Sequence, residues 1–68
     1  MKTYYVNKNE NEGYHEVHND SCHHLPEVAN RQHLGQFSNC DDAVNKAKNT
    51  YYENSDGCYY CCPDCDKH

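Results

Sequence analysis

Residues 58–65 read Cys-Tyr-Tyr-Cys-Cys-Pro-Asp-Cys, so this short stretch holds most of the six cysteines of the 68-residue chain. Cys58 and Cys61 form one Cys-x-x-Cys pair, and Cys62 and Cys65 form a second. Two-residue spacing lets a tight turn bring two thiolates to one ion, at zinc–sulfur distances of about 2.3 Å. The stretch therefore predicts half of a four-coordinate metal site, and either pair of cysteines fits that role.

A second candidate half-site lies upstream, where residues 18–22 read His-Asn-Asp-Ser-Cys. The segment leaves an expected strand and enters a turn. A half-site from residues 18–22 joined to one from 58–65 gives a four-coordinate zinc site that ties the first hairpin to the C-terminal tail. Alternatives stay open: His18 as an ordinary exposed strand histidine, His23 or Cys65 as the fourth ligand, and a disulfide framework for the six cysteines.

The chain has few core-forming side chains, since Val, Leu, Ile and Phe together number only seven and Trp is absent. A domain of this size buries only about 60% of the surface of its unfolded chain, so its core alone is marginal. Seven Tyr and six Cys argue against disorder, and small domains with too little core are held by disulfides or a structural metal. A structural zinc contributes on the order of 10 kcal/mol. The composition excludes a membrane span and a multi-domain enzyme, and we expect one domain over residues 1–68.

The hydrophobic pattern predicts a small α+β fold. Strand-like residues 3–7 and 14–18 flank a polar loop that ends in glycine, which predicts a β-hairpin. Residues 33–37 form a possible third strand, so the sheet is either the hairpin alone or three-stranded. One face of the second strand carries Tyr14, Glu16 and His18.

One main helix is expected over about residues 39–51, followed by a turn over 54–57 and the cysteine-rich tail. Ser38 is the expected N-cap, because Asp41 follows three residues later as in a capping box. The apolar side chains of this helix recur at helical spacing, at Cys40, Ala43, Val44, Ala47 and Tyr51.

The charge pattern disfavours nucleic acid as a partner. The net charge is −5, and of the six Lys and Arg residues only Lys46 and Lys48 lie close together, whereas nucleic-acid binders carry a basic stripe. We expect a monomer without membrane association; its partner is unidentified, and a protein is the candidate. Residues 1–7 lack the apolar segment of a targeting peptide, which predicts a cytoplasmic protein whose clustered cysteines bind metal rather than form disulfides.

The order of these motifs resembles the Ada-type metal-binding domain, the small zinc module at the N-terminus of the bacterial Ada DNA-repair protein. The likeness covers about residues 15–65 and rests on His18-x-x-x-Cys22, Asn30-Arg31, Phe37-Ser38 before an Ala-containing helix, and Cys58-x-x-Cys61 followed by Cys62-Pro63. The resemblance implies one Zn²⁺ held by His18, Cys22, Cys58 and Cys61, with Cys62 and Cys65 as alternates.

One departure from that family bears on function. In the Ada protein the first ligand of the upstream motif is the cysteine that accepts a methyl group from a DNA phosphotriester, whereas His18 stands there in this chain, and imidazole is not the activated thiolate that this reaction uses. We therefore predict a soluble, non-catalytic binding or adaptor module with one structural zinc. One alternative is a zinc-bound thiolate of Cys22 or Cys61 that accepts alkyl groups or senses redox state. The other is a secreted, disulfide-stapled domain.

Two smaller expectations concern packing. Cys40 lies on the apolar stripe of the helix and is expected to be a buried core thiol, with a bond to Cys65 or Cys62 as the second interpretation. In each of the tyrosine pairs 4/5, 51/52 and 59/60, one ring is expected to pack inward and the other to lie at the surface.

Overall fold

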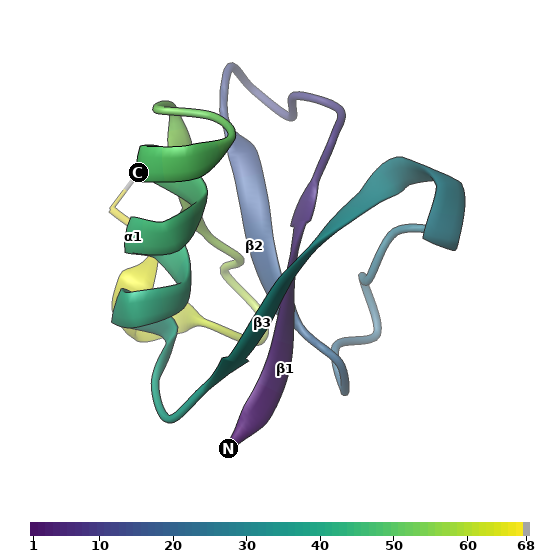
Figure 1. The fold of residues 1–68 in the computed structure, drawn as a ribbon. Helices are drawn as coiled ribbons and strands as arrows, with labels where there is room; N and C mark the ends of the chain where they lie inside the picture. Colours follow the sequence, from purple (N-terminus) through teal and green to yellow (C-terminus); the bar gives the residue numbers. More distant parts are fainter. Residues whose placement is uncertain (68) are drawn as a thin grey trace.

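The computed structural model describes residues 1–67 as a mixed four-stranded sheet with one α-helix packed against it (Figure 1). This confirms the predicted α+β class and main helix. The order of strands across the sheet is β3-β1-β2-β4. The elements are β1 Lys2–Asn7, β2 His15–Asn19, η1 Val28–Asn30, β3 Arg31–Phe37, α1 Cys40–Thr50, β4 Ser55–Gly57 and η2 Pro63–Cys65, where η marks a 3₁₀ helix.

Strands β1 and β2 form the predicted antiparallel hairpin, with Val6 opposite Val17. Strand β3 pairs antiparallel with the other edge of β1, and the register shifts between Tyr4 and Tyr5. Gly35 faces Tyr4 at this irregularity with a φ of 125°, a conformation that a residue without a Cβ adopts at little cost. The third strand is therefore real, and a local bulge adjusts its pairing.

Strand β4 was not predicted, because the sequence of residues 54–57 is typical of a turn. In the structure Ser55–Gly57 pairs parallel with β2, with Gly57 opposite Val17. The Ser55 hydroxyl donates a 2.6 Å hydrogen bond to the carbonyl of Tyr52, and the Cys58 N–H donates to the carbonyl of Val17 at 2.9 Å. The sheet thus has one strand more than predicted, and this strand leads directly into the cysteine-rich segment.

Helix α1 begins one residue after the predicted start and lies on one face of the sheet (Figure 1). The prediction of Ser38 as N-cap is wrong, because the Asn39 side chain accepts a 2.9 Å hydrogen bond from the backbone N–H of Asp42. The predicted stripe also ends early: Tyr51 is 41% exposed because the helix has ended before it. The buried residues of the stripe are Ala43, Val44 and Ala47.

The core is small and lies between α1 and the sheet. Its members outside α1 are Tyr4, Val6, Val17, Leu34, Cys62 and Cys65. Strand β2 is buried on both faces, since both Val17 and its neighbour His18 are almost inaccessible. Among the helical segments of residues 1–67, none has the length and apolar character needed to cross a membrane.

Gly57→Ala should destabilise the protein. A Cβ at this position would lie 2.6 Å from the Cβ of Cys65 and 2.8 Å from the carbonyl oxygen of Cys62, and such overpacking costs on the order of 1–3 kcal/mol. Urea unfolding measures the loss. Gly13→Ala is the control, because its Cβ would meet nothing within 4 Å and only its φ of 88° is strained. A loss for Gly57→Ala no larger than for Gly13→Ala would contradict this prediction.

Candidate metal centre

The upstream half of the site is shaped by the turn that ends β2. The Asn19 side chain accepts a 2.9 Å hydrogen bond from the Ser21 N–H, and its backbone carbonyl accepts one from the Cys22 N–H at 3.2 Å. These bonds fold the chain back at once after the strand, as Asn commonly does in turns. As a result the Cys22 thiol returns to the His18 ring, with 3.5 Å between Sγ and Nδ1.

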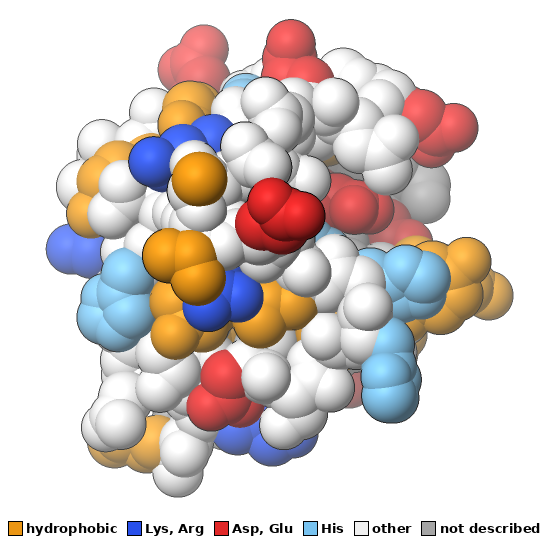
Figure 2. Space-filling model, turned by 90° about the vertical axis from the view of Figure 1, so that its right-hand side faces the viewer, with side chains coloured by type: hydrophobic (Ala, Val, Ile, Leu, Met, Phe, Trp, Pro, Cys, Tyr) orange, Lys and Arg blue, Asp and Glu red, His pale blue; other side chains and the backbone are white. Residues whose placement is uncertain are grey.

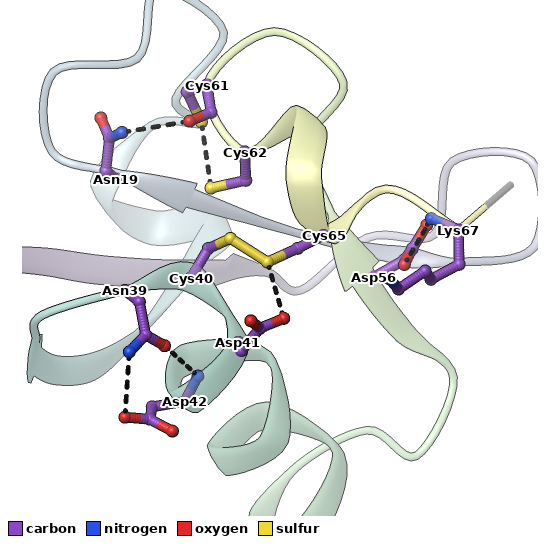
Figure 3. The surroundings of a disulfide bond; sticks show 10 residues. All are labelled: Asn19, Asn39, Cys40, Asp41, Asp42, Asp56, Cys61, Cys62, Cys65 and Lys67. Atoms are coloured by element: carbon purple, nitrogen blue, oxygen red, sulfur yellow. Dashed lines mark hydrogen bonds between the residues drawn. A yellow bond between two sulfur atoms is a disulfide. The ribbon is translucent and has the colours of Figure 1, made fainter.

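The downstream half follows β4 directly. Cys58 is held beside β2 by its N–H bond to Val17, and the Cys62 N–H bonds to the Cys58 carbonyl at 2.8 Å to close a tight turn. The Asn19 amide donates to the Cys61 carbonyl at 3.5 Å (Figure 3). One asparagine therefore contacts both halves of the site.

The structure brings four of the sequence-predicted residues together: one ligand atom from each of His18, Cys22, Cys58 and Cys61 lies within 4.8 Å of all the others. In a tetrahedral zinc site with ordinary bond lengths, two sulfur ligands lie about 3.8 Å apart and a sulfur and a nitrogen about 3.6 Å apart. The Cys22 Sγ lies 3.9 Å from the Cys58 Sγ and 3.5 Å from the His18 Nδ1. These two separations fit a tetrahedral ion.

Burial, together with a hydrogen bond at Cys61, shifts the pKa values of the four groups. It lowers the pKa of His18 to about 4, so the ring is neutral at pH 7 and keeps the lone pair that a metal needs. It raises the pKa of the Cys58 thiol to about 12 and also raises the pKa of Cys22. A hydrogen bond to Cys62, followed by burial, raises the pKa of Cys61. A divalent cation reverses this preference for neutral thiols, because it stabilises three clustered thiolates.

A carboxylate lies near the second ring nitrogen of His18, where it could orient the ring. The Nε2 atom is buried and makes no hydrogen bond within residues 1–67, while the Glu16 Oε1 lies 3.9 Å away. A histidine that binds metal through one nitrogen commonly donates the other N–H to a carboxylate, which fixes the ring. Glu16 is placed to take that role once its carboxylate moves within hydrogen-bond distance. Neither Glu16 nor Asn19 was predicted as part of the site, although the placement of Glu16 and His18 on one strand face was a usable signal.

The remaining cysteines, Cys40, Cys62 and Cys65, lie outside this cluster. Cys62 is buried, and its Sγ lies 3.7 Å from the Cys61 Sγ (Figure 3), but it is outside the four-residue group. The hydrogen bond from Cys61 lowers the pKa of Cys62. Cys65, the other alternate ligand, is joined to Cys40 by a disulfide. Cys40 is therefore half-buried and bonded rather than a free core thiol, so the second of its two interpretations holds.

One side of the cluster opens to solvent. His18 and Cys58 are buried, whereas Cys22 and Cys61 are partly exposed and line a hollow of about 350 Å³ with Lys2, His23, His24 and Tyr60 among its walls. The rings of His24 and Tyr60 stack, with centroids 4.1 Å apart.

For the tyrosine pair 59/60 the prediction of one inward ring is wrong, because both residues are more than 60% exposed.

Comparisons of the chain with models of protein families, with curated proteins and with solved structures give no match. The functional interpretation therefore rests on the residues and geometry of this chain.

Replacing a residue of the four-member cluster should empty the site. Cys22→Ser, Cys58→Ser and Cys61→Ser each remove one thiolate and leave three ligands, so the zinc content per purified chain should fall well below one. Cys62→Ser is the matched control, because it changes the neighbouring buried thiol outside the group. Elemental analysis of desalted protein gives the zinc content. If Cys62→Ser empties the site and Cys22→Ser does not, the assignment is wrong.

Metal removal should unfold the chain, because the core is small and the two half-sites are otherwise joined by few bonds. A strong chelator is expected to erase the dispersion of backbone amide signals in an NMR spectrum, and added zinc should restore it. Dispersion that persists after elemental analysis has verified metal loss would contradict this expectation.

Proposed function

We propose that this protein is a small structural-zinc module in which His18, Cys22, Cys58 and Cys61 bind one Zn²⁺. The observation that carries the proposal is that one nitrogen and three sulfur atoms from distant parts of the chain lie within 4.8 Å of one another. The two separations that involve Cys22 Sγ with His18 Nδ1 and with Cys58 Sγ match those of a tetrahedral ion. Three thiolates and one imidazole are a donor set typical of structural zinc. Thiolates are softer ligands than oxygen groups. They disfavour Mg²⁺ and Ca²⁺, which prefer oxygen ligands.

The site supports a binding or adaptor role rather than catalysis. Four protein ligands fill a tetrahedral zinc and leave no position for a substrate. The resemblance to the Ada-type domain agrees with a zinc-held α+β fold, and we propose kinship at that level alone. His18 occupies the place of the methyl-accepting cysteine, so that reaction is not proposed for this residue.

A protein partner is favoured over nucleic acid. On the face drawn in Figure 2, Lys and Arg side chains lie in separate places among acidic and apolar ones, without a continuous stripe. A hollow of about 450 Å³ is lined by Glu12, Glu16, Asp56 and Asp66 and by no Lys or Arg. An acidic hollow repels phosphates.

The split of the cysteines into one disulfide pair and four free thiols supports a metal-binding domain over a secreted domain held by disulfides. Within residues 1–67 one disulfide joins Cys40 and Cys65, and the other four cysteines are free thiols gathered near one another. A framework of three disulfides would pair them all. We also propose that the protein is cytoplasmic and acts as a monomer.

Native mass spectrometry of protein purified without added metal or chelator tests the proposal. The expected mass corresponds to one zinc ion and one disulfide, with Cys22, Cys58, Cys61 and Cys62 outside any disulfide. A mass lower by six hydrogen atoms relative to the fully reduced chain, without metal, would overturn it in favour of the disulfide framework.

A second candidate function is a zinc-bound thiolate that accepts an alkyl group or senses oxidants. It is favoured by the partial exposure of Cys22 and Cys61 in the hollow of about 350 Å³, because thiolate reactivity requires access. Treatment of the zinc-loaded protein with iodoacetamide separates the two functions. Stoichiometric alkylation of Cys22 or Cys61 with zinc retained indicates an acceptor, whereas an inert site that reacts only as zinc is lost indicates a structural role.

Affinity for duplex DNA should be negligible at physiological salt, because the net charge is −5 and the cations are scattered. An electrophoretic mobility assay with a random duplex at micromolar protein checks this. A salt-sensitive shift would contradict the prediction and favour a nucleic-acid partner.

A further inference from the structure

A second group of metal-binding side chains lies where α1 begins. Cys40 and Asp41 occupy the first two positions of the helix, and Cys65 approaches them from η2 (Figure 3). One ligand atom from each residue lies within 4.8 Å of the other two, and the Asp41 Oδ1 is 3.2 Å from the Cys65 Sγ. The two sulfurs are joined as a disulfide, so this group binds no ion while it is oxidised.

The polypeptide around Cys65 is held in place by contacts that do not involve the disulfide. The Lys67 N–H donates to both carboxylate oxygens of Asp56, at 3.1 and 2.9 Å, and the Cys65 N–H bonds to the Cys62 carbonyl at 3.0 Å. Gly57 packs so closely on Cys65 that a Cβ would not fit between them. Opening of the S–S bond therefore leaves both thiols beside Asp41.

The site is also accessible and electrostatically suited to thiolates. Cys40 and Asp41 line a hollow of about 480 Å³ that also borders Cys62 and Asp64, so an ion has a path from solvent. Cys40 is in the first turn of α1, where the unpaired N–H groups and the helix dipole favour a negatively charged sulfur.

We propose that reduction of the Cys40–Cys65 disulfide creates a second metal site, in which Cys40, Cys65 and Asp41 bind a thiophilic divalent cation such as Zn²⁺ or Cd²⁺. A dithiol reductant transfers two electrons and two protons to the disulfide and becomes a disulfide itself. The two protein thiols then release two protons as they bind the ion, which takes two sulfur ligands, one carboxylate oxygen and a water. The metal load of the chain thereby depends on the redox state of this one cysteine pair.

Metal stoichiometry in the two redox states tests this proposal. Full-length protein is prepared air-oxidised or reduced with a dithiol, desalted without oxygen, and titrated with Zn²⁺ or with Co²⁺, whose thiolate charge-transfer absorption reports Co–S bonds. The oxidised protein should bind one equivalent and the reduced protein two. Reduced Cys40→Ser should bind one, and reduced Asp41→Asn should bind the second equivalent about tenfold or more weakly.

Two control variants keep this result separate from the first site. Reduced Asp42→Asn should still bind two equivalents, because this carboxylate is adjacent in sequence but bonded to Asn39 and outside the group. Reduced Cys22→Ser should keep one equivalent, which an added Cys40→Ser removes. If the His18 cluster binds no metal, reduction should still raise the stoichiometry from zero to one. The proposal is overturned if reduction adds no equivalent, or if Cys40→Ser leaves the added one in place.

Discussion

The parallel pairing of β4 with β2 positions most of the chemistry in this molecule. It spans only three residue pairs, yet it sets Cys58 next to the end of β2 through the bond from its N–H to Val17. From there one tight turn brings Cys61 to Cys22 and His18. Parallel strands need a long crossover between them, and here the chain between β2 and β4 passes through η1, β3 and α1. The helix carries the chain from β3 on one edge of the sheet to β4 on the other.

The cluster itself was within reach of sequence reasoning because its two halves are local. His18 and Cys22 are separated by one turn, and Cys58 and Cys61 by another, and such spacing has few other uses in a chain with so little core. The inference that the two half-sites join into one metal site came from the small core, which calls for a metal or disulfides. No sequence pattern shows that the two half-sites meet. Glu16 and Asn19 were not predicted as site residues. The shared strand face of Glu16 and His18 was a signal, but it does not by itself distinguish a supporting carboxylate from a solvated one, and the turn carries no such signal for Asn19.

Three structural details were not predictable from local sequence. Ser55–Gly57 has turn-like composition, and its extended form depends on pairing with a strand 40 positions upstream. Ser and Asn are both favoured at the N-cap, and in the structure Asn39 rather than Ser38 takes that position. The bond between Cys40 and Cys65 joins residues 25 positions apart, and cysteine spacing alone left it as the second interpretation of Cys40, with Cys62 as an equal partner.

The two cysteine groups lie at opposite ends of one segment with few core residues. Residues 58–62 meet β2 and its turn at the group of His18, Cys22, Cys58 and Cys61. Residues 63–67 are fixed to α1 and β4 by the Cys40–Cys65 bond and the Asp56 carboxylate. Cys58, Cys62 and Cys65 are buried in this segment, while Tyr59 and Tyr60 face solvent. Because each link constrains a different end, neither replaces the other. A chain with this few apolar side chains therefore uses sulfur chemistry where larger domains use hydrophobic burial.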